Sequence, residues 1–108
     1  MATHNIADKH LLHYLQVEAR DQPDCFIGDA ELYGMMGVYG GHLLGQGLCA
    51  AVRTVEEPKV THSFHAYFLN RCDPDLKLSY QIQRLRSGKW GDTRSITASQ
   101  EGQQVFHM

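Results

Sequence analysis

The pattern of hydrophobic and polar positions divides the chain into one helical stretch and a series of strand-like segments. Between Val38 and Thr54, small and apolar residues recur at helical spacing, which predicts a buried helix. On a helical wheel, the face that we expect to pack against the core holds Leu44, Leu48, Ala51, Val52 and Val55. The face that we expect to be presented outward holds His42, Gln46, Cys49 and Arg53.

Downstream of this helix, apolar and polar residues alternate as they do in strands with one buried face. We expect strands over residues 60–69, 76–86 and 90–100, then a tight hairpin at Glu101–Gly102 and a last strand over residues 103–108. In the first of these strands, the residues expected to share one face are Phe64, Ala66 and Phe68.

Upstream of the helix, the sequence predicts three shorter features. Residues 10–19 fit a short amphipathic helix, residues 25–28 fit a strand, and residues 31–37 fit a loop with unusual apolar mass. The whole order predicts an α+β domain in which an antiparallel meander packs on one helix.

Small residues make the helical stretch unusual. They are Gly41, Gly45, Gly47, Ala50 and Ala51, and they allow a covering element to approach closely. At its start, Gly40 and Gly41 provide no capping side chain, so the first amides of the helix lack a local acceptor. Such amides can bind an anion or polarise a carbonyl group, or they can be satisfied by water or by a loop carbonyl.

Composition and charge narrow the class of protein. The 108 residues suffice for one domain, and 43% hydrophobic with 20% charged residues is typical of a globular protein. A net charge of −2 gives no electrostatic reason to expect nucleic acid or an anionic membrane as a partner. The apolar runs are too short to span a bilayer, and the first residues do not resemble a signal peptide, so we expect a cytoplasmic protein.

The cysteines and histidines do not form a recognisable metal or disulfide framework. Cys25, Cys49 and Cys72 are odd in number and widely spaced, which favours reduced thiols. His62 and His65 would point to opposite faces of a strand, so we expect no metal site there.

Three ordered blocks of sequence resemble one known family. They are Val38-Tyr39-Gly40-Gly41-His42-Leu43-Leu44-Gly45-Gln46-Gly47-Leu48, then His62-Ser63-Phe64-His65-Ala66-Tyr67-Phe68-Leu69, and then Arg86-Ser87-Gly88 with Arg94-Ser95-Ile96-Thr97-Ala98-Ser99-Gln100-Glu101-Gly102. Together they resemble the amino-terminal half of acyl-CoA thioesterase II. The resemblance implies a hotdog fold, a curled antiparallel sheet wrapped around one long central helix.

Members of that family are similar to two fused hotdogs that hydrolyse fatty acyl-CoA, with the catalytic Asp, Thr and Gln in the carboxy-terminal half. The resemblance implies that residues 1–108 are a single hotdog domain, the amino-terminal half of such an enzyme, either naturally single or cut. By position, Gln100 matches the catalytic Gln, and Ser63 lies near the position of the Thr. No Asp or Glu lies between Gly40 and Val55, so the expected helix carboxylate is missing.

Thioester hydrolysis requires a polarised carbonyl and an activated water molecule. For the carbonyl and the rest of the substrate, the binding residues that we expect are Gly40, Gly41, His42, Gln46 and Arg94. For the catalytic group, we expect Gln100, His65 and Ser63. Asp92 and Asp29 are further candidates for the base, which could also act across a dimer interface. The structural alternatives are that His65 is a hydrogen-bonded strand residue and that Asp92 caps a strand end.

Two functions follow from these observations. The first is hydrolysis of fatty acyl-CoA to free fatty acid and CoA, without a cofactor, by a homodimer of paired hotdogs or by pairing with a second hotdog domain. The second is a catalytically silent hotdog that binds acyl-CoA or serves as a structural half for a partner domain. Dehydration of a hydroxyacyl thioester would require a His and an acid together, and the sequence shows no such pair.

Overall fold

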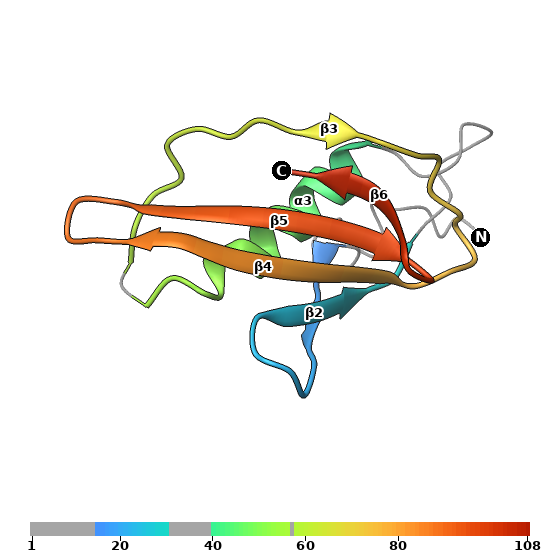
Figure 1. The fold of residues 1–108 in the computed structure, drawn as a ribbon, viewed down its shortest axis with the longest axis horizontal. Helices are drawn as coiled ribbons and strands as arrows, with labels where there is room; N and C mark the ends of the chain where they lie inside the picture. The colour runs from blue at the N-terminus through green and yellow to red at the C-terminus, as the bar shows by residue number, and fades with distance from the viewer. Residues whose placement is uncertain (1–14, 31–39, 57) are drawn as a thin grey trace, which may run out of the picture.

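The fold is a six-stranded antiparallel sheet with a helix on one face, within the part of the chain that the structure describes (Figure 1). The structure is a computed structural model that describes residues 15–30, 40–56 and 58–108. The elements are β1 (Glu18–Ala19), β2 (Cys25–Gly28), α3 (Gly40–Val52), β3 (Tyr67–Phe68), β4 (Leu78–Ser87), β5 (Asp92–Gln100) and β6 (Gln103–His107). The strands lie in the order β1-β2-β4-β5-β6-β3. The predicted α+β class is therefore confirmed.

The centre of the sheet is the meander β4-β5-β6, which the alternating pattern predicted. Along β4, Leu78, Tyr80 and Ile82 are buried while the residues between them are exposed, as in a strand with one covered face. The turn between β5 and β6 is at Glu101 and Gly102, whose φ angles of 49° and 86° are the two positive values that a type I′ hairpin requires. The predicted hairpin is confirmed at that position.

Helix α3 buries only part of the predicted face: Ala51 is buried and Leu44 packs against the core, but most of the buried helical residues lie elsewhere. The buried helical residues are His42, Leu43, Gln46, Gly47, Ala50 and Ala51, whereas Val52 is 51% exposed. A Cβ added at Gly47 would lie 3.4 Å from Phe106 and 3.6 Å from Ile96, so the helix approaches β5 and β6 through its small residues. The expectation that His42 and Gln46 point outward is wrong, because both polar side chains find partners beneath the helix.

The predicted strand over residues 60–69 is also wrong in most of its length. Only Tyr67 and Phe68 pair, and they pair with β6 at the edge of the sheet. Phe64 and Phe68 are 53% and 56% exposed, so the expected buried face is absent. In the antiparallel register Tyr67 lies opposite His107, the last residue of β6, so the residues before Tyr67 have no β6 residue beside them.

The segment before β2 differs from its prediction as well. Glu18 and Ala19 form β1 and pair with Ile27 and Phe26, so the helix predicted over residues 10–19 does not extend through this part. Residues 10–14 of that predicted helix and the loop predicted over residues 31–37 lie outside the described residues. The strand predicted over residues 25–28 is confirmed as β2.

Candidate functional site

The first turns of α3 carry a buried polar network that ties the helix to the end of β2. The ring Nε2 of His42 donates to the carbonyl oxygen of Asp29 at 2.7 Å, and the Nε2 of Gln46 donates to the same oxygen at 2.9 Å. His42 and Gln46 are 1% and 0% exposed. The two side chains therefore face one group, the backbone carbonyl of Asp29.

Tyr80 of β4 completes this network from the sheet. Its hydroxyl donates to Oε1 of Gln46 at 2.7 Å, which leaves the amide nitrogen of Gln46 directed at Asp29. Burial raises the pKa of the Tyr80 hydroxyl, so the donor stays protonated at neutral pH. We define these four residues, Asp29, His42, Gln46 and Tyr80, as the Asp29 network.

A glycine makes room for this network. A Cβ added at Gly28 would lie 2.7 Å from Oε1 and 2.8 Å from Nε2 of Gln46, which is shorter than van der Waals contact. The amide of Gln46 can lie against β2 because residue 28 has no side chain. Gly28 and Tyr80 were missed from the sequence. Tyr80 could have been predicted, because it occupies an inward position of β4 and a buried hydroxyl needs a hydrogen-bond partner.

The start of α3 lies beside the edge strand β3. A Cβ added at Gly40 would lie 3.1 Å from Cζ of Phe68, so the glycine permits close contact with that ring. Gly40 and Gly41 are partly exposed, and the first turn of the helix contains no acidic side chain. The helix start therefore combines a positive helix terminus with two residues that carry no side chain.

Gln100 lies at the end of β5, where its side chain holds the turn before β4. Its Oε1 accepts from the amide of Asp73 at 2.8 Å, and its Nε2 donates to the carbonyls of Asp73 at 2.7 Å and Leu76 at 3.1 Å. Ser63 and His65 are exposed on the segment that leads to β3. Among the described residues, no hydrogen bond joins either of them to Gln100.

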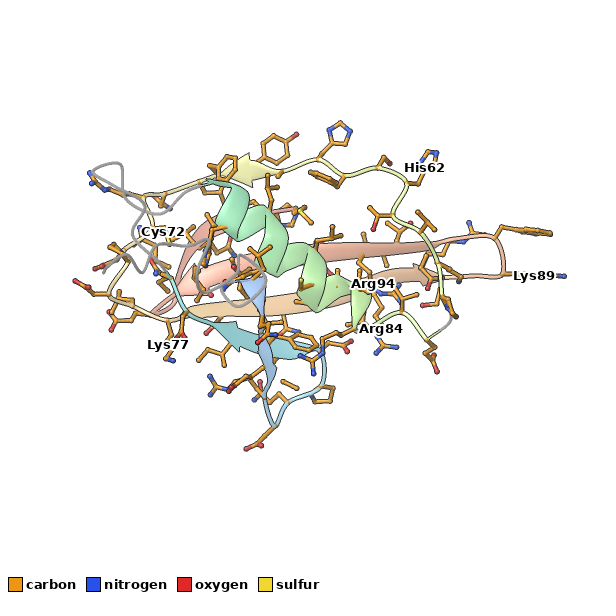
Figure 2. All side chains as sticks on the ribbon, turned by 180° about the vertical axis from the view of Figure 1, so that it is seen from behind. His62, Cys72, Lys77, Arg84, Lys89 and Arg94 are labelled. Carbon is orange, nitrogen blue, oxygen red and sulfur yellow. The ribbon has the colours of Figure 1, made fainter. Side chains whose placement is uncertain are left out.

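Arg94 connects the hairpin β4-β5 to the carboxyl end of α3 (Figure 2). Its Nε donates to Oγ1 of Thr54 at 2.7 Å and its Nη2 to the carbonyl of Thr54 at 3.1 Å. Its Nη1 donates to the carbonyl of Arg86 at 2.8 Å, and its side chain is only 6% exposed. The guanidinium is therefore bonded to the chain itself.

The other candidate bases differ in their surroundings. Lys59 bonds the carboxylate of Asp92 at 2.7 Å, and this bond, with a second from the amide of Gly88, lowers the pKa of Asp92. The side chain of Asp29 is exposed and forms an ion pair with Lys77. In the described ranges, no group of three or more His, Cys, Asp or Glu residues is placed to hold a metal ion.

The chain is similar to known thioesterases in sequence. Residues 30–108 match the family model described as the acyl-CoA thioesterase N-terminal domain. Human acyl-coenzyme A thioesterase 8 is 37% identical over 92 residues, which cover 85% of this chain and 28% of the relative. Acyl-CoA thioesterase 2 of Haemophilus influenzae is 31% identical over 99 residues, which cover 92% of this chain and 34% of the relative. The chain thus spans no more than 34% of either relative's length.

Solved structures show the same similarity in three dimensions. The tesB protein of Mycobacterium avium subspecies paratuberculosis has a TM-score of 0.80 at 30% identity, covering 95% of this chain and 40% of that chain. A hypothetical thioesterase with coenzyme A from Streptococcus pneumoniae has a TM-score of 0.73 at 15% identity, covering 95% of this chain and 91% of that chain. At that identity, the second likeness shows the fold alone.

Proposed function

Since the chain belongs to the acyl-CoA thioesterase N-terminal domain family, we propose that it is the amino-terminal hotdog half of an acyl-CoA thioesterase. In the proposed reaction, water adds to the thioester carbonyl and the CoA thiolate leaves, which yields a free fatty acid and CoA without a cofactor. The names of the relatives support this reaction, because both are called acyl-CoA thioesterases. In the whole protein, we propose that the sheet curls around α3 as its central helix.

The observation that carries this proposal is the Asp29 network beneath the start of α3. Two side chains from the first turns of the helix bind one carbonyl at the end of β2, and Tyr80 fixes one of them. The helix start is therefore tied to β2, and its first residues, Gly40 and Gly41, are partly exposed and carry no side chain. Preorganised amides at a helix terminus stabilise the oxyanion of a tetrahedral intermediate. In this proposal, His42 and Gln46 position the amides that bind the substrate.

The second part of the proposal is a partner hotdog at the β3 edge. The exposed apolar stripe beside this edge consists of Val60, Phe64, Tyr67, Phe68 and Leu69. An edge strand with unpaired backbone groups and apolar side chains is suited to pairing with another strand. The partner is a second copy of this chain or a second hotdog domain, and it would enclose Ser63 and His65, which are open to solvent here.

The proposed pairing also bears on which residue acts as the catalytic base. Asp92 and Arg94 are engaged in ion pairs and hydrogen bonds within the chain, and Gln100 holds the turn at Asp73. We therefore assign Gln100 a positioning role and place His65, with Ser63 beside it, as the candidate base at the joined interface. In this proposal, His65 contacts the attacking water molecule only after the partner domain has covered His65.

A catalytically silent half that binds acyl-CoA is the alternative. Two observations favour it: no Asp or Glu lies between Gly40 and Val55, and the amide of Gln100 makes three hydrogen bonds to the turn before β4. Among the described residues, no helix combines the length and apolar character needed to cross a bilayer. A cytoplasmic location and the absence of a nucleic-acid partner remain predictions from the sequence.

The test is release of CoA from acyl-CoAs of increasing chain length by the purified chain and by Gln100→Ala, with Gln83→Ala on the exposed face of β4 as the matched control. Turnover that falls in Gln100→Ala and persists in Gln83→Ala supports the enzyme. An absence of turnover, with a melting temperature that rises in the presence of acyl-CoA, supports the silent half. If acyl-CoA neither reacts nor raises the melting temperature, both proposals are wrong.

A further inference from the structure

The hairpin between β4 and β5 carries an exposed aromatic ring at one end of the longest axis of the molecule (Figure 1). Its turn consists of residues 88–91, and Lys89 in this turn points away from the rest of the chain (Figure 2). Trp90 is 88% exposed, whereas tryptophan side chains are highly buried on average. The hairpin end, which we define as residues 85–91, therefore presents a large aromatic side chain to solvent.

Hydrogen bonds close the turn of this hairpin. The amide of Gly88 donates to the carbonyl of Gly91 at 3.1 Å and to the carboxylate of Asp92 at 3.0 Å. In the turn itself, Nζ of Lys89 lies 5.2 Å from the ring centroid of Trp90, a distance at which a cation is attracted to the face of the ring. The exposed ring is therefore carried by a closed turn and has a lysine beside it.

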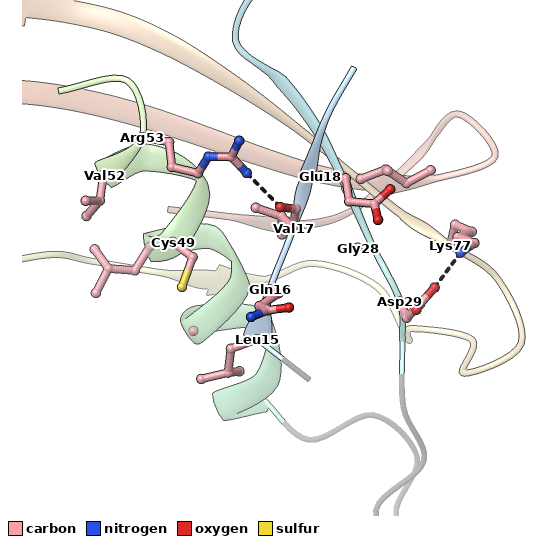
Figure 3. A pocket seen from close by; sticks show the side chains of 13 residues that line it. Leu15, Gln16, Val17, Glu18, Gly28, Asp29, Cys49, Val52, Arg53 and Lys77 are labelled. Atoms are coloured by element: carbon pink, nitrogen blue, oxygen red, sulfur yellow. Dashed lines mark hydrogen bonds and ion pairs between the residues drawn. The ribbon is translucent and has the colours of Figure 1, made fainter. Parts of the chain in front are cut away.

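Two basic side chains of the hairpin end form no ion pair with a carboxylate of the described residues. They are Arg86 and Lys89, and both are exposed. By contrast, Lys77 at the opposite end of β4 forms an ion pair with Asp29 (Figure 3). Residues 83–91 contain no Asp or Glu. The hairpin end therefore carries a local positive charge, although the net charge of the whole chain is −2.

The described acidic residues near the hairpin end have basic partners of their own. The side chain of Asp92 is 8% exposed and pairs with Lys59 at 2.7 Å. Asp24 accepts two hydrogen bonds from Arg84, at 2.9 and 3.0 Å, and Glu56 lies close enough to Arg84 to interact with it electrostatically. These carboxylates therefore leave the charges of the hairpin end available to an anionic surface.

Leu85 places a second apolar side chain at the hairpin end. It lies where the register of β4 and β5 shifts between Arg84 and Arg86, and it is 56% exposed. Apart from neighbours in the chain, no described atom lies within 4 Å of a Cβ added at Gly91, so the turn protrudes into open space. A protruding turn of this kind is suited to a broad surface rather than to a groove. The amphipathic ring of tryptophan is favoured at the interface between lipid headgroups and hydrocarbon.

We propose that the hairpin end binds the surface of an anionic lipid bilayer. Trp90 and Leu85 enter the headgroup region, and Arg86 and Lys89 lie against anionic headgroups. This attachment does not depend on the proposed hydrolysis and goes beyond it. Because long acyl chains partition into bilayers, the attachment would also hold the chain close to lipids of that kind.

The fluorescence of Trp90 reports on this site alone, because it is the only tryptophan of the 108 residues. The purified chain is mixed with vesicles of phosphatidylcholine, either pure or with about 30% phosphatidylserine, and binding is also measured by co-sedimentation. We expect the vesicles that contain phosphatidylserine to shift the emission of Trp90 to shorter wavelength, and brominated lipid in the same vesicles to quench it. High salt should weaken the binding, because it screens the attraction between exposed charges.

Charge reversal provides a matched pair of variants. Lys89→Glu should lower the partition coefficient onto the phosphatidylserine vesicles about thirtyfold, because each unit of charge near such a surface changes partitioning about fivefold. Arg71→Glu makes the same change in net charge in the connection that leads to the start of β4, and it should change partitioning by less than about threefold. Both residues are exposed, so the fold should tolerate either change.

Four results would overturn the proposal. Emission of Trp90 that stays unchanged with phosphatidylserine vesicles would exclude insertion of the ring. Co-sedimentation without a shift in emission would assign the binding to another surface of the chain. Equal binding to pure phosphatidylcholine would remove the requirement for anionic lipid, and an equal loss in Lys89→Glu and Arg71→Glu would show that only net charge matters.

Discussion

Arg94 determines how the hairpin β4-β5 meets the helix. Its guanidinium donates to Thr54 at the end of α3 and to the carbonyl of Arg86 on β4, so one side chain bonds two elements that come from separate parts of the chain. Thr54 lies just past the last residue of α3, so the donors of Arg94 satisfy the carbonyl of Thr54 and its charge opposes the negative end of the helix dipole. A sequence pattern identifies such an arginine only as a charge on an inward position of a strand.

Replacement of Arg94 by lysine should therefore destabilise the fold although the positive charge is retained. An ammonium group cannot reproduce the fork of donors that reaches Thr54 and Arg86, so the variant leaves buried acceptors without partners. We expect urea denaturation to show a loss of about 2–3 kcal/mol in the free energy of unfolding. The control is Arg86→Lys at an exposed position, and an equal loss in both variants would contradict the role of Arg94.

The buried thiol of Cys72 leads us to predict how the free energy of unfolding changes at alkaline pH. Burial, together with the nearby charge of Asp73, raises the pKa of Cys72 from 9.0 to about 11. Above pH 9.0 the unfolded thiol loses its proton while the folded thiol keeps it, so the free energy of unfolding should fall as pH rises toward 11. Below pH 9.0 this contribution is fully present.

The measurement is urea denaturation at a series of pH values from about 8 to 11, the range in which the thiol titrates. Cys72→Ala should reduce the slope of stability against pH in this range, whereas Cys25→Ala at a half-exposed strand position should leave the slope in place. Burial also raises the pKa of Tyr80, so a residual slope should remain at the upper end. An unchanged slope in Cys72→Ala would contradict this account.

At the scale of elements, the contact between α3 and β2 depends on the absence of a side chain at one position. The Gln46 amide cannot move away from a Cβ at residue 28 without breaking its bonds to Tyr80 and Asp29. Gly45 is different, because the atoms nearest to its added Cβ belong to the flexible side chain of Leu15, 2.6 Å away. The packing of α3 against the sheet therefore tolerates a side chain least at Gly28. Gly45 instead packs against the segment before β1.

Gly28→Ala should cost about 1–3 kcal/mol in the free energy of unfolding, which is the usual range for overpacking. Gly91→Ala is the matched control, since no atom lies within 4 Å of its added Cβ, and we expect a change within about 0.5 kcal/mol. Thermal and urea denaturation of both variants would check this difference. A double variant with Gln46→Ala should lose less than the sum of its single changes, because the clash is removed with the amide.

The elements differ in how far their sequences predict them. On β4, the alternation of Leu78, Tyr80 and Ile82 with polar residues sufficed, because the strand has one covered face and one exposed face. The buried face of α3 was not predictable by hydrophobicity, since His42 and Gln46 are polar and become buried only through partners on β2 and β4. These partners lie in distant parts of the sequence, so the spacing of residues along the helix does not predict them.

At the scale of the whole molecule, the sheet is asymmetric. One side is covered at its centre by α3, whereas the β3 edge carries exposed apolar side chains (Figures 1 and 2). Alternation along residues 60–69 predicted a strand with Phe64, Ala66 and Phe68 on one face, but no described element covers Phe64, which is 53% exposed. We propose that a second molecule or a second domain covers this stripe.

We therefore expect the isolated chain to sediment as a dimer at micromolar concentration. Tyr67→Lys, at a position 63% exposed, should shift the chain toward the monomer, because burying an unpaired ammonium group at the interface is costly. Leu85→Lys, which is 56% exposed on the other end of the sheet, is the control and should stay dimeric. A wild-type monomer at this concentration would contradict the pairing of two copies.

The strand order also sets a sequence of events for the newly made chain. β3 leaves the ribosome before β4, β5 and β6, yet its ladder partner is β6, the last strand in the described residues. The backbone of Tyr67 and Phe68 therefore stays without its β6 partner, and the ring of Phe68 stays without its contact to Phe106, until β6 has been synthesised. During this interval the nascent segment is a natural target for chaperones that bind exposed aromatic side chains.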